Sequence, residues 1–161
     1  MAGRSFNDIK TSAADAGFRQ VTAVTTQQAD DTIAEVSAGE TVSVTHSTKH
    51  QLLGFNTLVL YSYVVDDDEG DDATYTGIAV KYKLYREKVV GNKRKFALLG
   101  SEGTVTLTNA TYTSATDTLV PGLIAISDSN IESATHISFE ADFTAPAGAS
   151  VGIELGKTAA L

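Results

Sequence analysis

The sequence lacks cysteine and tryptophan, and each absence limits what the protein can do. The only methionine is Met1. Without cysteine, neither disulfide bonds nor thiol catalysis is available to the chain. Tryptophan is the usual stacking platform of carbohydrate-binding modules, so its absence counts against that class of protein. With 161 residues, one domain can bury about two thirds of its unfolded surface and needs no disulfide or metal ion for stability.

Long apolar runs are also missing. No run of about 18 apolar residues occurs, which excludes a transmembrane helix. The first ten residues, MAGRSFNDIK, lack the apolar core of a classical secretory signal. We therefore expect an intracellular product that is soluble when made and has no membrane partner.

Positive charge is scarce. Twelve Lys and Arg residues stand against 20 Asp and Glu residues, which gives a net charge of −8. Non-specific binding to nucleic acid needs a basic surface, so we expect no nucleic-acid partner.

Catalytic and metal-binding motifs are absent as well. No G-x-S-x-G elbow occurs, and the three histidines lie in no recognised catalytic context. His46 and His50 are four residues apart, and on an extended strand their rings would be about 13 Å apart, too far to share a metal ion. We therefore predict that the chain is not an enzyme and has no cofactor and no metal site.

What the sequence does contain is the alternation of β-strands. The stretch LLGFNTLVLYSYVV, residues 52–65, is largely apolar on both faces, which predicts a central strand covered on both sides. The clearest alternation lies in ATHISFEADFT. There Ile137 and Phe139 point one way, while His136 and Ser138 point the other, with Glu140 and Asp142.

Turn signals separate these stretches at short intervals. Ser37–Glu40 predicts a tight turn between two hairpin strands, and Gly91-Asn92 predicts a two-residue hairpin. Gly100 and Gly103 bracket a further predicted turn. Pro121-Gly122 indicates a bulge, an edge strand or a break between two strands, because proline cannot donate a ladder hydrogen bond.

Eight to ten strands and no convincing helix predict an all-β fold. We expect an antiparallel β-sandwich, with a jelly roll among the arrangements it allows, over a single domain at residues 19–161. Residues 1–18 precede it as an N-terminal arm or a short helix. The predicted core consists of Leu58, Leu60, Ile78, Val80, Tyr82, Leu84, Val105, Leu107, Ile137, Phe139, Phe143, Val151 and Ile153.

An acidic loop follows the central strand, at residues 66–72. Its spacing does not match an EF-hand, because Gly70 lies four residues after Asp66 and no glutamate follows at the required distance. The loop is a solvated surface loop, a calcium site or a charged docking loop. We expect it to be exposed, mobile and unnecessary for folding.

A basic segment comes next and holds most of the cations of the chain. It comprises Lys81, Lys83, Arg86, Lys88, Lys93, Arg94 and Lys95. These residues protect an edge hairpin from pairing with other chains, bind an acidic protein partner or bind nucleic acid. We predict partner contacts at Lys93, Arg94 and Lys95. Because one molecule carries both an acidic and a basic segment, copies can attract each other head to tail.

The N-terminal residues have too few apolar side chains to order themselves. Phe6, Ile9 and Phe18 are the only large apolar residues of the arm, so we expect it to become ordered against a neighbouring subunit. These three residues are therefore further predicted partner contacts, and the protein is predicted to be a homo-oligomer.

The whole chain resembles the small decoration, or cement, proteins of tailed-phage heads. The resemblance rests on the N-terminal arm, the Thr/Ala/Gly-rich β-domain and the small-residue ending TAPAGASVGIELGKTAAL. It implies a virion protein, made in the host cytoplasm, that binds the outer surface of a capsid. Its partners would be the major capsid protein or neighbouring subunits, often in a trimer.

The alternative is a carbohydrate-binding or adhesin-type β-sandwich module. Its stacking residues would be drawn from Tyr61, Tyr63, Tyr82, Tyr85 and Tyr112.

Overall fold

The computed structural model describes residues 26–66 and 70–160. The described chain is all-β, as predicted, with two single-turn 3-10 helices at Ser114–Thr116 and Ile131–Ser133. The strands are β1 (Thr26–Val36), β2 (Thr41–Val44), β3 (His50–Gln51), β4 (Thr57–Asp66), β5 (Ala73–Tyr75), β6 (Ala79–Val90), β7 (Lys93–Thr106), β8 (Ala110–Thr113), β9 (Thr118–Val120), β10 (Gly122–Ile126), β11 (His136–Thr144) and β12 (Ala149–Ala160). The predicted arm at residues 1–18 and the predicted domain boundary at residue 19 lie outside the described residues.

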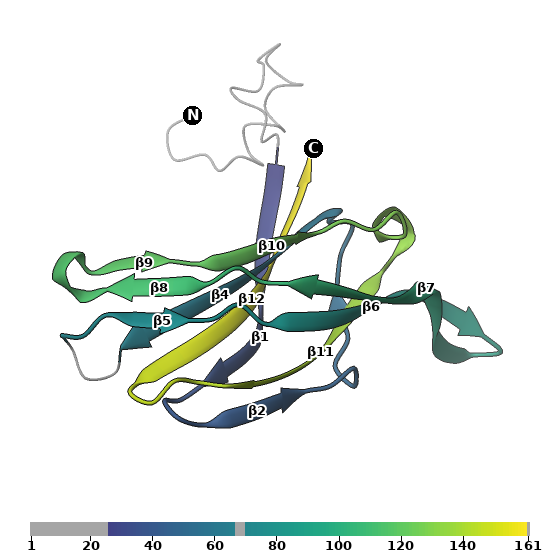
Figure 1. Cartoon of the computed structure of the whole chain (residues 1–161). Helices are drawn as coiled ribbons and strands as arrows, with labels where there is room; N and C mark the ends of the chain where they lie inside the picture. The colour runs from purple at the N-terminus through teal and green to yellow at the C-terminus, as the bar shows by residue number, and fades with distance from the viewer. Residues whose placement is uncertain (1–25, 67–69, 161) are drawn as a thin grey trace, which may run out of the picture.

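The strands form antiparallel sheets that pack as two layers (Figure 1). One sheet has the order β1-β12-β4-β10. The other has the order β2-β11-β6-β7, with β3 also paired to β11. A small sheet of order β5-β8-β9 continues the second layer beyond a short interruption, where the Leu107 amide donates to the Ile78 carbonyl at 2.9 Å.

The hydrophobic core lies between the inner faces of the two layers. β4 and β12 supply one side, and β6 and β11 supply the other. Eleven of the thirteen predicted core residues are buried. The two exceptions, Ile78 and Val105, are half-buried and still pack against the core, because Ile78 precedes β6 at the interruption and Val105 lies on the edge strand β7.

The predicted central strand is β4, which lies between β12 and β10. Its inner face is buried, as Leu58 and Leu60 show. Its outer face differs from the prediction, because Tyr61 and Tyr63 are only half-buried and Val65 is exposed. Apolar character on both faces of this strand therefore does not mean that both faces are covered.

The turn at Ser37–Glu40 forms as predicted, with the Glu40 amide donating to the Ser37 carbonyl at 3.0 Å. The prediction that it joins two hairpin strands is wrong. β1 pairs with β12 and β2 pairs with β11, so this turn carries the chain from one sheet to the other. Local residues determine the turn, but the pairing partners come from far along the chain.

The predicted turn at Gly100 and Gly103 is also wrong, because β7 runs through it without a break. Leu99 pairs with Leu84 and Gly103 pairs with Tyr82, so residues 100–102 all lie opposite Lys83 alone. This is a large β-bulge. A Cβ atom at Gly103 would lie 2.3 Å from the Tyr82 ring, so glycine is needed here for close packing.

Pro121-Gly122 predicted a bulge, an edge strand or a break between two strands. Pro121 lies between β9 and β10, which belong to different sheets, and β10 is an edge strand. The proline therefore stands at a break between two strands, where its missing amide costs no ladder hydrogen bond.

One lysine lies on the inner side of the sandwich, where the two layers meet. Lys157 has 4% of its side-chain surface exposed. Its Nζ donates to the Asp31 carboxylate at 2.9 Å and to the Gln51 carbonyl at 2.8 Å. His50 lies on the other side of the same carboxylate, with its Nδ1 3.5 Å from Asp31 Oδ2. These contacts join β12 and β1 of one layer to β3 of the other.

Replacing Lys157 by alanine should lower the free energy of unfolding by about 3 kcal/mol. The change leaves Asp31 and the Gln51 carbonyl without their cation in a poorly solvated place. Lys81→Ala is the control, because Lys81 forms its ion pair at the surface with half of its side chain exposed, and it should lower the free energy of unfolding far less. The measurement is urea unfolding of both variants. Equal losses would contradict the role given to Lys157.

Candidate functional site

The hairpin formed by β6 and β7 extends beyond the rest of the sandwich (Figure 1). Gly91 and Asn92 form its turn, with φ values of 56° and 65°. Positive φ at both turn residues is the requirement of the two-residue hairpin, so this prediction is confirmed. The Val90–Lys93 pair closes the ladder. We call residues 86–98 the basic hairpin.

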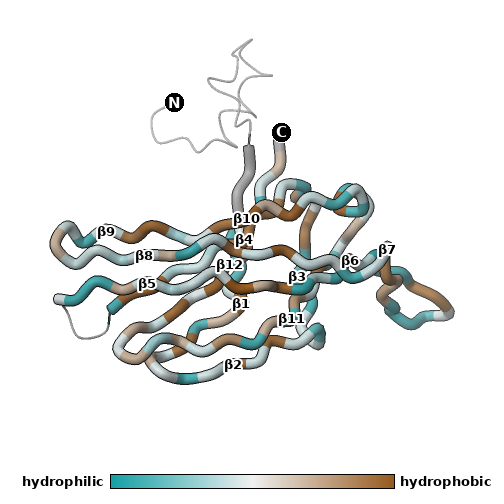
Figure 2. Tube along the Cα trace, in the orientation of Figure 1, coloured by the Kyte–Doolittle hydropathy of each residue, from teal (hydrophilic) through white to brown (hydrophobic). Residues whose placement is uncertain are grey.

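The basic hairpin exposes both apolar and cationic side chains. Val89 and Val90 are 70% and 66% exposed, and Phe96 and Leu98 are also exposed. Figure 2 shows hydrophobic stretches directly beside hydrophilic ones along this hairpin. Lysines alone would protect an edge strand, whereas exposed valines at its tip are a liability unless they are covered by a partner.

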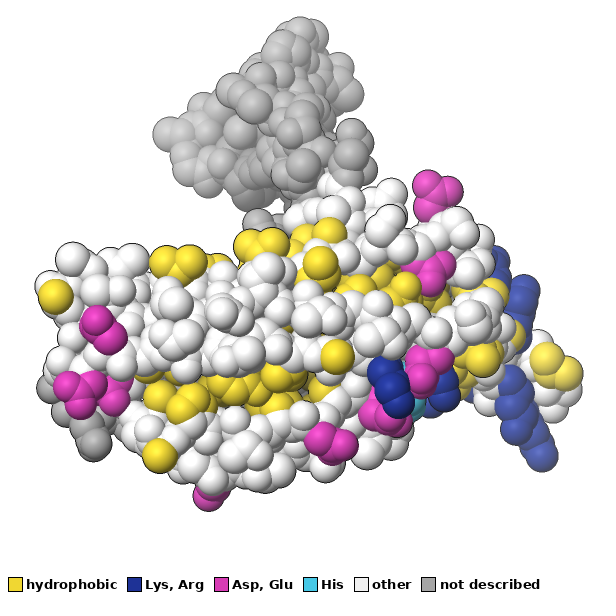
Figure 3. Space-filling model, in the orientation of Figure 1, with side chains coloured by type: hydrophobic (Ala, Val, Ile, Leu, Met, Phe, Trp, Pro, Cys, Tyr) yellow, Lys and Arg dark blue, Asp and Glu magenta, His cyan; other side chains and the backbone are white. Residues whose placement is uncertain are grey.

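The predicted contact residues Lys93, Arg94 and Lys95 all lie on the β7 side of this hairpin and are exposed. Figure 3 shows Lys and Arg side chains gathered at this end of the molecule. Arg94 is 77% exposed although its Nε contacts Glu87 at 2.9 Å. The other predicted contact residues, Phe6, Ile9 and Phe18, lie outside the described residues.

A group of aromatic rings fixes the base of the basic hairpin. The Phe96 ring lies 4.9 Å from His136 and 6.3 Å from Tyr85, measured between ring centroids. Lys49 Nζ lies 5.1 Å from the centroids of both Tyr85 and Phe96. His136 lies on the outer face, as predicted, but it is buried, because Phe96 from the hairpin covers it.

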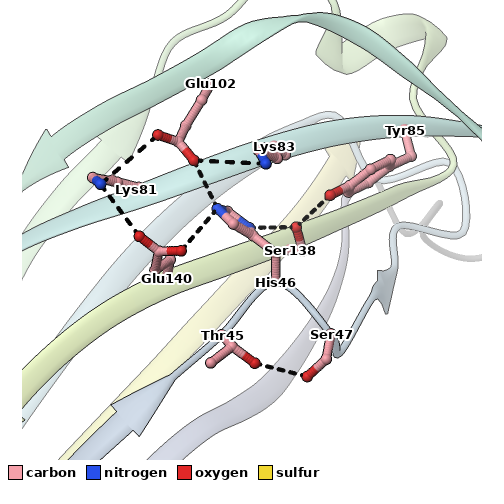
Figure 4. Close-up of polar contacts among 9 residues, drawn as sticks. All are labelled: Thr45, His46, Ser47, Lys81, Lys83, Tyr85, Glu102, Ser138 and Glu140. Carbon is pink, nitrogen blue, oxygen red and sulfur yellow. Dashed lines mark hydrogen bonds and ion pairs between the residues drawn. The ribbon is translucent and has the colours of Figure 1, made fainter.

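A polar network lies beside this aromatic group on the same face (Figure 4). His46 is at its centre: Nδ1 lies 2.7 Å from Ser138 Oγ, and Nε2 lies 2.9 Å from Glu102 Oε2. Lys81 contacts Glu140 at 3.2 Å, and Lys83 lies 3.9 Å from Glu102. The β7 bulge brings Glu102 into this network. The sequence did not indicate this contact, because Gly100 and Gly103 predicted a turn at this place.

The order Ser138–His46–Glu102 resembles the hydroxyl–imidazole–carboxylate chain of a hydrolase. However, Ser138 has no exposed surface, and its Oγ also lies 3.0 Å from the Tyr85 hydroxyl. A substrate carbonyl cannot reach this oxygen in the folded chain. The network instead holds the loop around His46 against the sheet, and the absence of enzymatic activity stays a prediction.

The acidic loop is described only in part, because residues 67–69 lie outside the described chain. Gly70, Asp71 and Asp72 are exposed, as predicted. Asp66 accepts a hydrogen bond from the Asp71 amide at 3.2 Å, and Asp72 accepts one from the Ser114 amide at 2.8 Å. Within residues 26–66 and 70–160, no group of three or more His, Asp or Glu side chains is placed to hold a metal ion.

The tyrosines named for the carbohydrate alternative do not share one surface, and Tyr112 is half-buried against the core on β8. Tyr82 and Tyr85 are buried, and the Tyr82 hydroxyl donates to Asp128 at 3.0 Å. Tyr61 and Tyr63 instead lie side by side on the outer face of the sheet β1-β12-β4-β10. Their ring centroids are 6.3 Å apart, and the ring planes differ by 20°.

Stability should fall as the pH drops below about 6.5. Burial lowers the pKa of His50 and of His136 from 6.5, so the unfolded chain binds more protons than the folded chain below that pH. For His50, Asp31 opposes the shift and Lys157 adds to it. For His136, Glu87 opposes it, while Arg94 and Lys49 add to it. The free energy of unfolding should therefore be constant above the unfolded pKa and fall as pH descends towards the folded values.

The measurement is urea unfolding at about pH 7.5 and about pH 5.5. The double variant His50→Asn and His136→Asn should show a smaller difference between the two pH values than the unchanged chain, because asparagine does not titrate. If the unfolding free energy changes equally with pH in both proteins, the two histidines are not the source of the pH dependence.

Comparison with protein-family models, with curated proteins and with solved structures finds no match for this chain. Among the described residues, no helix is long and apolar enough to cross a membrane. The function must therefore be argued from the fold, the basic hairpin and the surfaces of the chain itself.

Proposed function

We propose that this chain is a structural virion protein, a decoration or cement module that binds the outer surface of a phage head and stabilises it. The observation that carries the proposal is the basic hairpin, which extends beyond the sandwich and exposes Val89 and Val90 beside a row of cations. Such a surface is typical of a segment that docks on another protein.

The order of the strands supports the same proposal. Apart from the two-residue strand β3, eight strands make up the two main sheets, namely β1, β2, β4, β6, β7, β10, β11 and β12. Counted along the chain, they lie in the order first-eighth-third-sixth and second-seventh-fourth-fifth. We propose that this arrangement is a jelly roll. Viral capsid domains and lectins both use jelly rolls, and the basic hairpin supports the first class in this proposal.

The energetics of the basic hairpin agree with docking. Burying Val89 and Val90 against a partner contributes about 1.5–3 kcal/mol for each side chain. The cations Lys93, Arg94 and Lys95 favour an acidic partner surface and speed its approach. That partner is the major capsid protein or a neighbouring copy of this chain. The arm residues Phe6, Ile9 and Phe18 supply a second contact within a homo-oligomer, a trimer as the resemblance implies.

Changing Lys93, Arg94 and Lys95 to serine should abolish co-sedimentation with purified phage heads. The double variant Val89→Ser and Val90→Ser should weaken it at least tenfold. A matched control is Leu119→Ser with Val120→Ser, because these side chains are also exposed and lie on the other protruding hairpin, β8–β9. If the basic-hairpin variants bind heads as well as the control does, the hairpin is not the docking element.

Deleting residues 1–18 should weaken both self-association and binding to heads. In this proposal Phe6, Ile9 and Phe18 contact the partner, where burying three large apolar side chains would stabilise the complex. The measurement is light-scattering mass of the full-length and truncated chains, alone and with heads. If the full-length and the truncated chains are both monomers and neither binds heads, the assembly function is contradicted. Binding to glycans without binding to heads would favour the carbohydrate alternative.

A further inference from the structure

A second distinctive surface lies on the opposite layer from the basic hairpin, on the outer face of β1-β12-β4-β10. Paired residues of antiparallel strands share a face, so the register shows which side chains meet there. Gly156 pairs with Asp30, and Gly152 pairs with both Glu35 and Tyr63. We call this surface the tyrosine face. It comprises Asp30, Glu35, Tyr61, Tyr63, Gly152, Glu154 and Gly156.

Two hollows lie beside the aromatic rings and the carboxylates, each next to a glycine. A Cβ atom at Gly156 would lie 2.8 Å from the Tyr61 ring and 3.5 Å from Asp30 Oδ1, so the ring packs closely over this glycine and the carboxylate lies beside it. The hollow lined by these residues measures about 350 Å³. At Gly152 a Cβ atom would meet nothing within 4 Å, and the hollow beside it measures about 520 Å³. Glu154 lines both hollows.

The tyrosine face is negatively charged and carries no compensating cation. Among the described residues, Asp30, Glu35 and Glu154 take part in no ion pair. β1, β4, β10 and β12 together contain one cation, Lys157, which is buried on the inner side against Asp31. The pKa of Tyr63 is raised, first by burial and then by Glu154, Tyr61 and Asp30. The carboxylates of Glu154 and Asp30 therefore lie close enough to the Tyr63 hydroxyl to oppose its ionisation.

Parallel aromatic rings beside unpaired carboxylates are suited to Lys and Arg side chains. A cation gains attraction from the ring faces and a charge-assisted hydrogen bond from each carboxylate. A neutral sugar would stack on the rings, but it would also remove water from three charged groups without neutralising them. The observations therefore favour a cationic ligand over a neutral one.

The chain itself carries a ligand of this kind. Lys81 and Lys83 are already held by Glu102 and Glu140. Among the described residues, Lys93 and Lys95 of the basic hairpin take part in no ion pair, and Arg94 is 77% exposed although it contacts Glu87. The basic hairpin belongs to the other layer and extends away from the sandwich, so it is presented to a neighbouring molecule (Figure 1). Its exposed Val89 and Val90 match the exposed Val65 at the end of the tyrosine face.

We propose that the tyrosine face of one copy binds the basic hairpin of the next copy. The cations of the hairpin enter the two glycine-floored hollows, and its valines cover the end of β4. This inference rests on the proposed function, because it identifies the acidic partner surface as the chain itself. The contact is head to tail, so it closes into a ring, such as a trimer, or continues as a filament.

The test uses two charge-reversed variants. The hairpin variant carries Lys93→Glu, Arg94→Glu and Lys95→Glu, and the face variant carries Asp30→Lys, Glu35→Lys and Glu154→Lys. The unchanged chain should self-associate when its concentration is raised stepwise to about 1 mM. Each variant alone should self-associate at least tenfold more weakly. An equimolar mixture should regain association, because the acidic hairpin then meets the basic face. A misfolded variant could not be rescued in this way.

The location of the contact has its own test. Tyr61→Ala with Tyr63→Ala should weaken self-association at least tenfold, whereas Leu119→Ala with Val120→Ala should not change it. Thr32 is exposed and pairs with Glu154, so it lies on the tyrosine face. Because the chain has no cysteine, Asn92→Cys in one copy and Thr32→Cys in another should give a disulfide-linked dimer on oxidation, and Asn92→Cys with Thr118→Cys should not.

The remaining outcomes separate this inference from the proposed function. A chain that stays monomeric at every concentration but binds phage heads through its hairpin overturns the inference and leaves the function intact. Self-association that is lost on deleting residues 1–18, but not on reversing either surface, also overturns it, because the arm would then be the contact. Binding of a neutral polysaccharide that is lost with Tyr61→Ala and Tyr63→Ala would overturn the assignment of a cationic ligand.

Discussion

The rest of the structure depends on the burial of alternate side chains of β4 and β12 against those of β6 and β11. Leu58, Leu60, Ile153 and Leu155 from one layer meet Phe139 and its neighbours from the other. This burial fixes the register of each strand pair, because a strand that slips by one residue turns its apolar face to water. β12 lies between β1 and β4, and every outer-face position of this sheet follows from that register.

The outer faces are where the chain departs from regular strand geometry. On one layer, three residues of β7 lie opposite Lys83 and bring Glu102 to His46. On the other layer, Gly152 leaves space beside Tyr63, and the Tyr61 ring lies over Gly156. Both departures depend on glycines, since a Cβ atom at Gly103 of the bulge would clash with the Tyr82 ring. Bulges and missing side chains shape a surface without disturbing the packing beneath it.

Charge is divided between the two layers. The sheet β1-β12-β4-β10 carries carboxylates on its outer face, and within residues 26–66 and 70–160 the exposed cations lie on β6 and β7. The net charge of −8 is a sum over the whole chain, so it gives the charge of neither outer face. This separation unites the proposed function with the further inference. A molecule with a basic projection and an acidic, ring-lined face offers complementary ends to its neighbours, and complementarity of this kind fixes orientation as well as affinity.

The sequence by itself determined the β class, the hairpin at Gly91-Asn92 and most of the core, because strand alternation and turn chemistry act over a few residues. It also placed Lys93, Arg94 and Lys95 together, since they are consecutive. Only the tertiary structure decided that Ser37–Glu40 connects two sheets, that Gly100–Gly103 is a bulge, and that Asp30, Glu154 and Tyr61 share a face. Those facts depend on pairing between strands that are in places more than 90 residues apart, such as Asp30 with Gly156. The residues around a strand do not specify which distant strand it pairs with.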